Sequence, residues 1–479
     1  MTDNARGPGR GQPLQGGGWG GLVFAPGVLR RERIPRSLSG WKLRRTLRAL
    51  VLVVSIVVWS LAAPLPMRAA NSAATQSKNP KPAGDAKHSS ETFKNSHNNL
   101  TKIGLDGCQA YKVKTLPGTH EYASEFLETM AIDPRARSSN EVWGLTADMD
   151  SHVPAAERAI YLSKSTNGGV TWTPIARLSS KYFNAKIGEG LRNGLAVTPG
   201  GKDFVVTTQL GAFQVIPHST MANAVVKPIA GPRVPDTRPK VPIPKQAGQP
   251  VRAGVVLITA DGKRMLIGYG YFDLTPQVYI YRRDRQGSWV EEGRFPRLPN
   301  DLDIFSMAFD DPHTAHPRSL YLGTGDQAYR LNLATMHWTR VTGVGPDSAI
   351  HGMSTVGGLH IAACWGVYNP VTPDEVARVT HARFLLHRMK DEVGPNIRAY
   401  GIEVDPLRPN REVLSAITGV YVSKDDGQDW RRLNDLPEGE FHTAHFNEDG
   451  TVILSGFAGT YIANPFSETC SPQLQRRGQ

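Results

Sequence analysis

Short runs of β-branched and aromatic residues alternate with Gly, Pro, Asn and Asp from about residue 108 onward. Alternating apolar and polar positions over a few residues predict β-strands, and the residues between the runs predict tight turns. The pattern recurs along the chain, and each copy opens with an apolar run that ends in a turn. The openings lie at 130–134, 195–201, 256–262, 307–312, 351–358, 402–406 and 444–450.

Most openings are followed by a second and a third apolar run, and several by a fourth, as in SLYLGTG, QAYRLNL and HWTRVTG after residue 312. A four-stranded unit repeated seven times, at intervals of 42–65 residues, is typical of a β-propeller. The last unit is one strand short, and the strand-like segment 109–115 before the first unit can supply that strand. The sequence therefore predicts an all-β, seven-bladed β-propeller with four-stranded blades, its ring closed by an N-terminal strand.

The composition agrees with a chain built from turns, since Gly (48) and Pro (35) together exceed a sixth of its 479 residues. The net charge is +12, but residues 1–70 carry +9 of it, from eleven Lys and Arg against two acids. The remaining +3 forms no basic stripe interleaved with aromatic residues, which argues against nucleic-acid binding. The chain has three cysteines and no known metal-binding or nucleotide-binding motif, so we expect no metal and no cofactor. We also expect the protein to be a monomer.

An uncharged apolar run at residues 49–63 follows a basic stretch that contains Arg44 and Arg45. This order predicts a secretory signal or an uncleaved N-terminal anchor, and the two arginines loosely resemble a twin-arginine signal. The bulk of the protein is therefore expected outside the cytoplasm, either secreted, periplasmic or membrane-anchored. The expected boundaries are an export signal or anchor over 1–70, a disordered tether over 71–107, the propeller over 108–470 and a tail over 471–479.

Two segments share a turn motif after an alternating strand, namely 165–172 (STNGGVTW) and 423–430 (SKDDGQDW). Both resemble the Asp-box, S/T-x-D/N-x-G-x-T-W, of bacterial-neuraminidase repeats, with Asn for Asp in the first and Asp for Thr in the second. The resemblance implies an Asp-box β-propeller whose boxes staple outer hairpins away from the central funnel. It implies structural roles for Ser165, Asn167, Gly169, Trp172, Ser423, Asp425, Gly427 and Trp430.

The Asp-box family includes sialidases, other glycosidases and binding propellers, so the resemblance implies a fold without selecting an activity. Sialidases resemble one another in an arginine triad, a Tyr/Glu nucleophile pair and an opening Arg-Ile-Pro. Residues 33–35 spell Arg-Ile-Pro but precede the apolar export segment, so we reject this match. Tyr271, Tyr400 and Glu403 are candidates for a nucleophile pair, although no spacing selects them.

Polar residues stand just before the expected inner strands, where the blades of a propeller converge on the central funnel. The candidates for ligand binding are Glu128, Arg192, Arg252, Asp303, His351, Arg398 and His442. The three arginines can bind a carboxylate, phosphate or sulfate through paired hydrogen bonds. Alternatively, the neighbouring acids neutralise them as ordinary salt bridges.

We therefore expect an exported binding or scaffold module at the cell envelope, with a glycan or protein ligand that is anionic if the arginines bind it. The alternative is a sialidase-like or other glycoside hydrolase, and the sequence leaves open whether the protein is an enzyme. Cys108 precedes the lone N-terminal strand and Cys470 follows the last strand, so pairing of these strands predicts a disulfide between them. Cys364 lies in an apolar run and is expected to be a buried thiol.

Overall fold

The structure is a computed structural model, and the chain divides into residues 1–83 and 84–479, with all of the described residues in the second part. The described residues are 100–103, 110–114, 116, 126–148, 154, 157–183, 194–220, 224–233, 250–270, 276–298, 303–325, 327–341, 344, 349–363, 366–370, 384–387, 399–428 and 430–467. Within these ranges, no helix is long and apolar enough to span a membrane. The predicted export segment, the tether up to residue 99 and all three cysteines lie outside these ranges.

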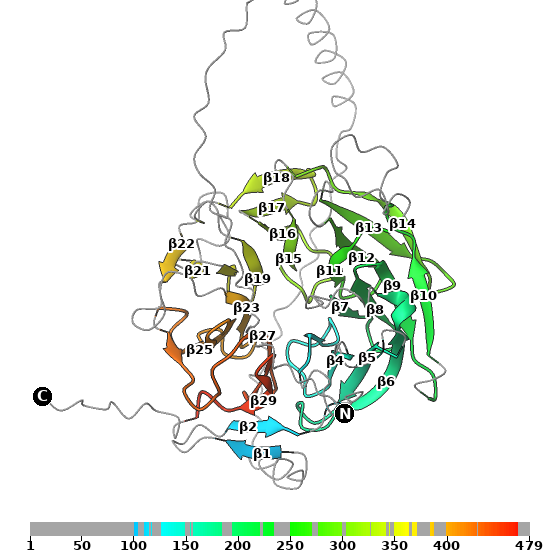
Figure 1. Ribbon diagram of the computed structural model, residues 1–479. Coiled ribbons are helices and arrows are strands. Elements are labelled where there is room, and N and C mark those ends of the chain that lie inside the picture. Colours follow the sequence, from blue (N-terminus) through cyan, green and yellow to red (C-terminus); the bar gives the residue numbers. More distant parts are fainter. Residues whose placement is uncertain are drawn as a thin grey trace, which may run out of the picture. The chain divides into compact units, whose positions relative to one another are not determined.

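Short antiparallel strands joined by turns build six four-stranded sheets within the described ranges (Figure 1). Each of these sheets is called a blade below. The first three blades contain β3 (Thr129–Ala131), β4 (Val142–Asp148), β5 (Ala159–Ser165) and β6 (Thr173–Ser179); β7 (Leu195–Val197), β8 (Phe204–Thr208), β9 (Gly211–Ile216) and β10 (Val225–Ile229); and β11 (Ala253–Ile258), β12 (Arg264–Tyr269), β13 (Gln277–Arg283) and β14 (Trp289–Arg294). The next three contain β15 (Ile304–Phe309), β16 (Ser319–Thr324), β17 (Ala328–Asn332) and β18 (His337–Arg340); β19 (Ile350–Ser354), β20 (His360–Ala363), β21 (Gly366–Pro370) and β22 (Phe384–His387); and β23 (Ala399–Val404), β24 (Glu412–Ala416), β25 (Gly419–Ser423) and β26 (Arg431–Arg432).

A seventh group of strands closes the ring and differs from the blades. It is a five-stranded sheet in the order β1-β2-β29-β28-β27, and we call it the closing sheet. Its strands are β1 (Leu100–Ile103), β2 (Ala110–Val113), β27 (Phe441–Phe446), β28 (Val452–Gly456) and β29 (Gly459–Ala463). Figure 1 shows β1 and β2 at its outer edge, beside β29.

The prediction of seven four-stranded blades is therefore wrong, because the described residues form six four-stranded blades and one five-stranded closing sheet. An N-terminal strand does join the chain's last strands, since β2 pairs with β29 with Ala110 opposite Ala463. The extra strand β1 pairs with β2 in full register. It was missed because Leu100 and Ile103 are its only apolar residues, within a segment otherwise polar enough to be assigned to the tether.

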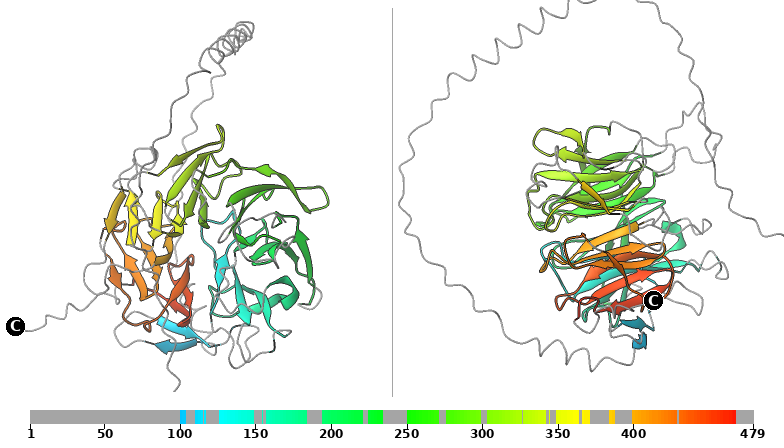
Figure 2. Two further views of the ribbon diagram at one scale, coloured as in Figure 1. Left: turned by 45° about the horizontal axis from the view of Figure 1, so that its top comes forward. Right: turned by 90° about the vertical axis from the view of Figure 1, so that its left-hand side faces the viewer.

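The blades and the closing sheet follow one another around a common axis, and their first strands form the inner edge of the ring. Each of these inner strands contacts the next, from β3 through β7, β11, β15, β19 and β23 to β27, which contacts β3 again. Figure 2 shows successive sheets packed face to face. Burial of apolar side chains between neighbouring sheets stabilises the ring, as where Leu145 and Ile160 of one blade pack with Phe204 of the next.

The two turns at 165–172 and 423–430 have the same internal hydrogen bonds. The backbone N–H of Gly169 donates to Ser165 Oγ, as that of Gly427 donates to Ser423 Oγ, both at 2.9 Å. The indole N–H of Trp172 donates to the Gly169 carbonyl at 2.8 Å, and that of Trp430 to the Gly427 carbonyl at 3.0 Å. The polar side chain between them, Asn167 or Asp425, also contacts the serine hydroxyl. The serine, glycine and tryptophan that the two turns share thus stabilise the turns, which lie on outer hairpins.

Candidate functional site

Five inner strands have a β-bulge at their second residue. The register with the neighbouring strand shifts between Ala253 and Val255, and in the same way at the start of β15, β19, β23 and β27. The bulged residues are Gly254, Phe305, His351, Tyr400 and His442. Because a bulge leaves one residue out of the ladder and re-aims its side chain, equivalent positions around the ring present side chains in the same way.

The bulged side chains contact one another from blade to blade along the inner edge of the ring. The ring centroids of Phe305 and His351 lie 5.1 Å apart, those of His351 and Tyr400 5.6 Å, and those of Tyr400 and His442 5.2 Å. These distances and the tilted or edge-on geometry are those of favourable aromatic pairs. Four successive inner strands therefore place one continuous line of rings at a single level.

Two phenylalanines extend this line beyond β27. His442 lies 4.7 Å from Phe457 and 5.8 Å from Phe126, and these two phenylalanines lie 5.0 Å from each other. Phe457, in the turn between β28 and β29, is 56% exposed, which is unusual for so large an apolar side chain. We call the whole line the aromatic array; it consists of Phe126, Phe305, His351, Tyr400, His442 and Phe457.

Two carboxyl groups on the inner strands have strongly perturbed protonation. Glu128 stands just before β3, where Thr129-Met130-Ala131 matches the Ser-Met-Ala that follows Phe305, so it occupies the place of the bulged residues. Glu403 follows Tyr400 by three residues on β23. Desolvation by burial raises the pKa of each carboxyl to about 8. Both groups therefore carry a proton over most of the neutral range and can donate a hydrogen bond.

A third acid near the aromatic array, Glu440, has a histidine of the array as its partner. Glu440 Oε1 lies 2.9 Å from His442 Nε2, and both side chains are partly shielded from solvent. This contact fixes the orientation of the imidazole ring that touches Phe126, Tyr400 and Phe457. The array thus combines apolar ring faces with a few oriented polar groups, which is the usual composition of a ligand site.

The predicted site residues divide into three sets. Glu128, His351 and His442 occupy equivalent bulge-level positions, and both histidines belong to the array. Arg252 and Asp303 lie two residues before the bulges of β11 and β15, and both are partly buried and have interaction partners. Arg192 and Arg398 lie outside the described residues. The proposed convergence of three arginines thus stays untested.

Sequence reasoning missed Phe126, Phe305 and Phe457, and it considered Tyr400 only for a nucleophile pair. The available signal was positional, because Phe305, His351, Tyr400 and His442 each stand two residues before the same apolar position of an inner strand. Apolar residues at the start of a strand are ordinarily assigned to the core. These residues differ from core residues only because a β-bulge re-aims their side chains, and no sequence pattern predicted the bulge.

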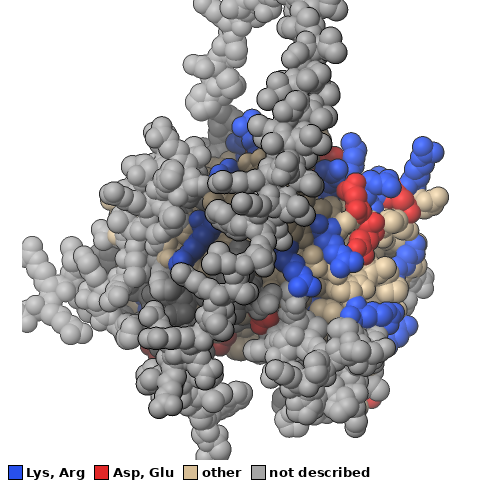
Figure 3. Space-filling model, turned by 90° about the horizontal axis from the view of Figure 1, so that it is seen from above, with Lys and Arg blue, Asp and Glu red and all other residues tan. Residues whose placement is uncertain are grey.

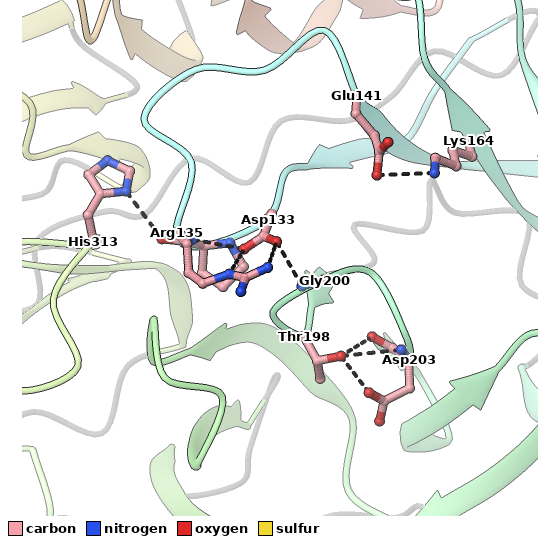
Figure 4. Close-up of polar contacts among 9 residues, drawn as sticks. Asp133, Arg135, Glu141, Lys164, Thr198, Gly200, Asp203 and His313 are labelled. Carbon is pink, nitrogen blue, oxygen red and sulfur yellow. Dashed lines mark hydrogen bonds and ion pairs between the residues drawn. The ribbon is translucent and has the colours of Figure 1, made fainter.

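The loops that follow the inner strands β3, β7 and β15 are joined by hydrogen bonds. These loops lie at the end of the inner strands opposite to the bulges. The Asp133 carboxylate accepts hydrogen bonds from Arg135 Nε at 3.0 Å and from the backbone N–H of Gly200 at 2.7 Å, on the next blade (Figure 4). His313, in the loop after β15, donates from Nδ1 to the carbonyl of Pro134 at 3.2 Å. Because β3 and β15 belong to blades that are not neighbours, this contact spans the ring.

The electrostatics of this end are those of a rigid structural turn. Desolvation alone would raise the pKa of Asp133, but hydrogen bonds from Arg135 and Gly200 outweigh it and lower that pKa to about 2. The carboxylate is therefore ionised at any physiological pH. The cross-ring contact lies at the end of the inner strands opposite to the aromatic array.

Charged side chains on β12, β13 and β14 form ion pairs. Arg264 Nε lies 3.3 Å from Glu292, Arg294 Nε lies 3.6 Å from Glu291, and an Arg283 nitrogen lies 2.9 Å from the buried Asp203. The surface in Figure 3 likewise shows basic and acidic side chains next to each other.

The arrangement of the blades around one axis defines the protein as a β-propeller. No known family model and no curated protein sequence matches the chain. Similar solved structures include the GH74 enzyme of Niastella koreensis (16% identity, TM-score 0.47), the GH74 xyloglucanase of Xanthomonas campestris (16%, 0.49) and YCF48 of Cyanidioschyzon merolae (11%, 0.46). The matches cover 78%, 78% and 76% of this chain, and 58%, 59% and 98% of those proteins. This chain thus spans less than two thirds of the two GH74 chains.

Proposed function

We propose that this protein is an exported binding module whose ligand docks on the aromatic array. The observation that carries the proposal is the unbroken line of rings from Phe305 to Phe457, contributed by three blades and the closing sheet. Rigid aromatic surfaces with one polar end gain much binding energy for little loss of side-chain entropy. The exposed ring of Phe457 is the natural contact point for an incoming ligand.

The polar groups around the array suit a ligand that carries hydroxyl groups. The nearby acid Glu440 is paired with His442, and the Glu128 carboxyl is protonated over most of the neutral range. A sugar chain fits these groups, because sugar rings offer apolar faces for the aromatic rings and hydroxyls for the imidazoles and the protonated carboxyl. A peptide segment with aromatic side chains is the other occupant that the same surface can accept.

A second candidate function is glycoside hydrolysis on the same surface. A general acid in such an enzyme needs a raised pKa, and burial raises that of Glu128 to about 8. The partner would be an ionised carboxylate across the bound sugar, and Glu440 is a nearby acid. We favour binding over hydrolysis because aromatic rings line four successive inner strands of the part that the structure describes.

Replacing Phe457 tests the proposal with little risk to the fold. Phe457→Ala is expected to weaken binding of any glycan or peptide found in a screen by about tenfold or more, the cost of losing one aromatic anchor. Leu407→Ala is the matched control, because Leu407 is 54% exposed and lies in the turn between β23 and β24. Affinity would be measured by calorimetry for the parent and both variants.

Equal affinities of the parent and Phe457→Ala for every ligand found would remove the array as the binding site. His351→Ala provides a second test at the other side of the array, with folding checked by thermal denaturation. Release of sugar from a bound glycan, abolished by Glu128→Gln, would instead establish the hydrolase alternative.

We further propose that the protein acts at the cell envelope and that its outer turns at 165–172 and 423–430 are Asp-boxes. The location is supported by the order of charge and apolarity over residues 42–63, and the boxes by their two matching sets of hydrogen bonds. The disulfide between Cys108 and Cys470 is part of the same proposal, since β2 pairs with β29. Peptide mapping without reduction is expected to find these two cysteines linked, and alkylation of both in the oxidised protein would contradict it.

A further inference from the structure

Three side chains of metal-binding type converge between two neighbouring blades, outside the aromatic array. His360 begins β20, Glu412 begins β24, and Asp426 lies in the turn after β25. One potential ligand atom from each of the three lies within 4.8 Å of the others. His360 Nδ1 and Glu412 Oε1 are 3.5 Å apart. Two bonds of about 2.0–2.1 Å at a tetrahedral angle place ligand atoms about 3.4 Å apart, which matches that distance.

The imidazole of His360 is buried and has no hydrogen-bond partner in the part of the chain that the structure describes. Its side chain is fully shielded from solvent, and neither ring nitrogen has a hydrogen-bond partner among the described residues. Buried polar groups in folded proteins are almost always hydrogen-bonded, because an unsatisfied one is costly. The side chain of Glu412 is equally buried. A ligand for the imidazole is therefore the missing element of this cluster.

The equivalent positions between the closing sheet and the first blade hold other residues. Ile453 pairs with His445 as His360 pairs with Ser354, and Val142 pairs with Ser165 as Glu412 pairs with Ser423. Ile453 and Val142 belong to one buried apolar cluster. The fold therefore accepts hydrophobic side chains at these two positions, and it does not require a buried histidine and a buried glutamate there.

At the third position of the cluster, too, a metal-binding side chain stands where the equivalent turn has a residue without one. The first turn has Gly168 with φ 64°, and the second turn has Asp426 with φ 62° at the equivalent place. Glycine adopts this left-handed conformation freely, whereas Asp does so at a small cost that is lower than for most other residues with a side chain. A carboxylate at this position thus replaces the residue that the backbone favours.

We propose that His360, Glu412 and Asp426 bind a divalent transition-metal ion, with zinc as the best match, that ties two neighbouring blades together. One imidazole and two carboxylates suit Zn²⁺ or Mn²⁺ better than Ca²⁺ or Mg²⁺, which take oxygen ligands only. The two carboxylates neutralise the charge of the ion, and the partly exposed Asp426 leaves a path for it to enter. Because His360 and Glu412 are fully buried, the ion has a structural role, independent of ligand binding on the array.

Metal content and affinity of the full-length protein test this proposal. The protein is stripped with a chelator, titrated with Zn²⁺ against a chromophoric competitor, and analysed for bound metal by mass spectrometry. We expect one high-affinity Zn²⁺ per chain, a Zn²⁺-dependent rise in melting temperature, and Co²⁺ absorption bands typical of nitrogen and oxygen ligands. Asp426→Asn keeps a residue that tolerates a positive φ and should weaken Zn²⁺ binding by about tenfold to a hundredfold.

A second variant separates metal binding from folding. The triple substitution His360→Ile, Glu412→Val and Asp426→Gly installs the residues of the apolar junction, and we expect it to fold, bind no tight Zn²⁺ and melt independently of Zn²⁺. Asp449→Asn, in the turn between β27 and β28, is the control for a carboxylate in another turn. Absence of tight binding in the parent, or equal binding by the parent and Asp426→Asn, would overturn the proposal and leave a buried histidine–glutamate pair.

Discussion

Gly352→Ala is expected to lower the free energy of unfolding by about 2–3 kcal/mol, the cost of forcing a methyl group into a packed interior. A Cβ atom at residue 352 would lie 2.7 Å from the Cα of Gly401 and 3.0 Å from the carbonyl oxygen of Tyr400. Both contacts are with backbone, so no side chain can rotate away. The close approach of β19 and β23 therefore depends on this glycine, and urea denaturation of parent and variant measures the difference.

Gly293→Ala is the matched control, because Gly293 also lies within a strand, β14, but nothing lies within 4 Å of a Cβ atom there. We expect no loss of stability from this control, and a small gain from the reduced entropy of the unfolded chain. Since Gly352 directly follows His351, separating β19 from β23 would also disturb the contact between His351 and Tyr400. Equal stability of Gly352→Ala and Gly293→Ala would show that the two strands can separate without cost.

Much of the strand arrangement followed from the sequence because it is a local property. A run such as QVYIYRR alternates aliphatic and aromatic residues at its centre, and β13 (Gln277–Arg283) has the bounds of that run. The turns were also predictable, since Gly169 and Gly427 have positive φ values, as the turn chemistry requires. The β1 strand was missed because its sequence, LTKI, shows no alternation of apolar and polar residues and lies in an otherwise polar segment.

The candidate site was predictable only in part, because it depends on contacts between blades. His351 and His442 were selected as polar residues at strand openings, but the rings that join them were hidden among apolar residues. The cluster of His360, Glu412 and Asp426 was missed altogether, since its residues are separated by 52 and 14 positions and come together only across two blades. No short metal-binding motif marks such a set.

The stability of the protein is expected to fall as the pH rises from 6.5 to 8, by about 1.5 kcal/mol for each of Glu128 and Glu403. Burial raises the pKa of each carboxyl from 4.5 to about 8. In this range the unfolded chain has ionised carboxylates while the folded protein keeps both protons. A raised pKa of an acid thus contributes stability that is complete below pH 4.5 and is lost as the pH passes 8.

Below pH 6.5, another buried group changes the stability of the protein in the opposite direction. Burial lowers the pKa of His445 from 6.5 to about 4, so its contribution to stability is complete above pH 6.5 and is lost as the pH falls through 4. Above pH 6.5 the contribution of His445 is constant. Of the groups with shifted pKa values near neutrality, only Glu128 and Glu403 are then expected to change the free energy of unfolding with pH.

Replacing both carboxyls by amides should remove this slope. The double variant Glu128→Gln and Glu403→Gln keeps the shape of the protonated side chains but cannot ionise, so its free energy of unfolding should stay nearly constant from pH 6.5 to 8. Glu438→Gln serves as the control, because the Glu438 side chain is 85% exposed and should leave the slope of the parent unchanged. Urea denaturation at several pH values gives the slopes directly. If the double variant loses as much stability as the parent over this range, the two carboxyls are ionised in the folded protein, and the neutral character assigned to the inner edge of the ring is wrong.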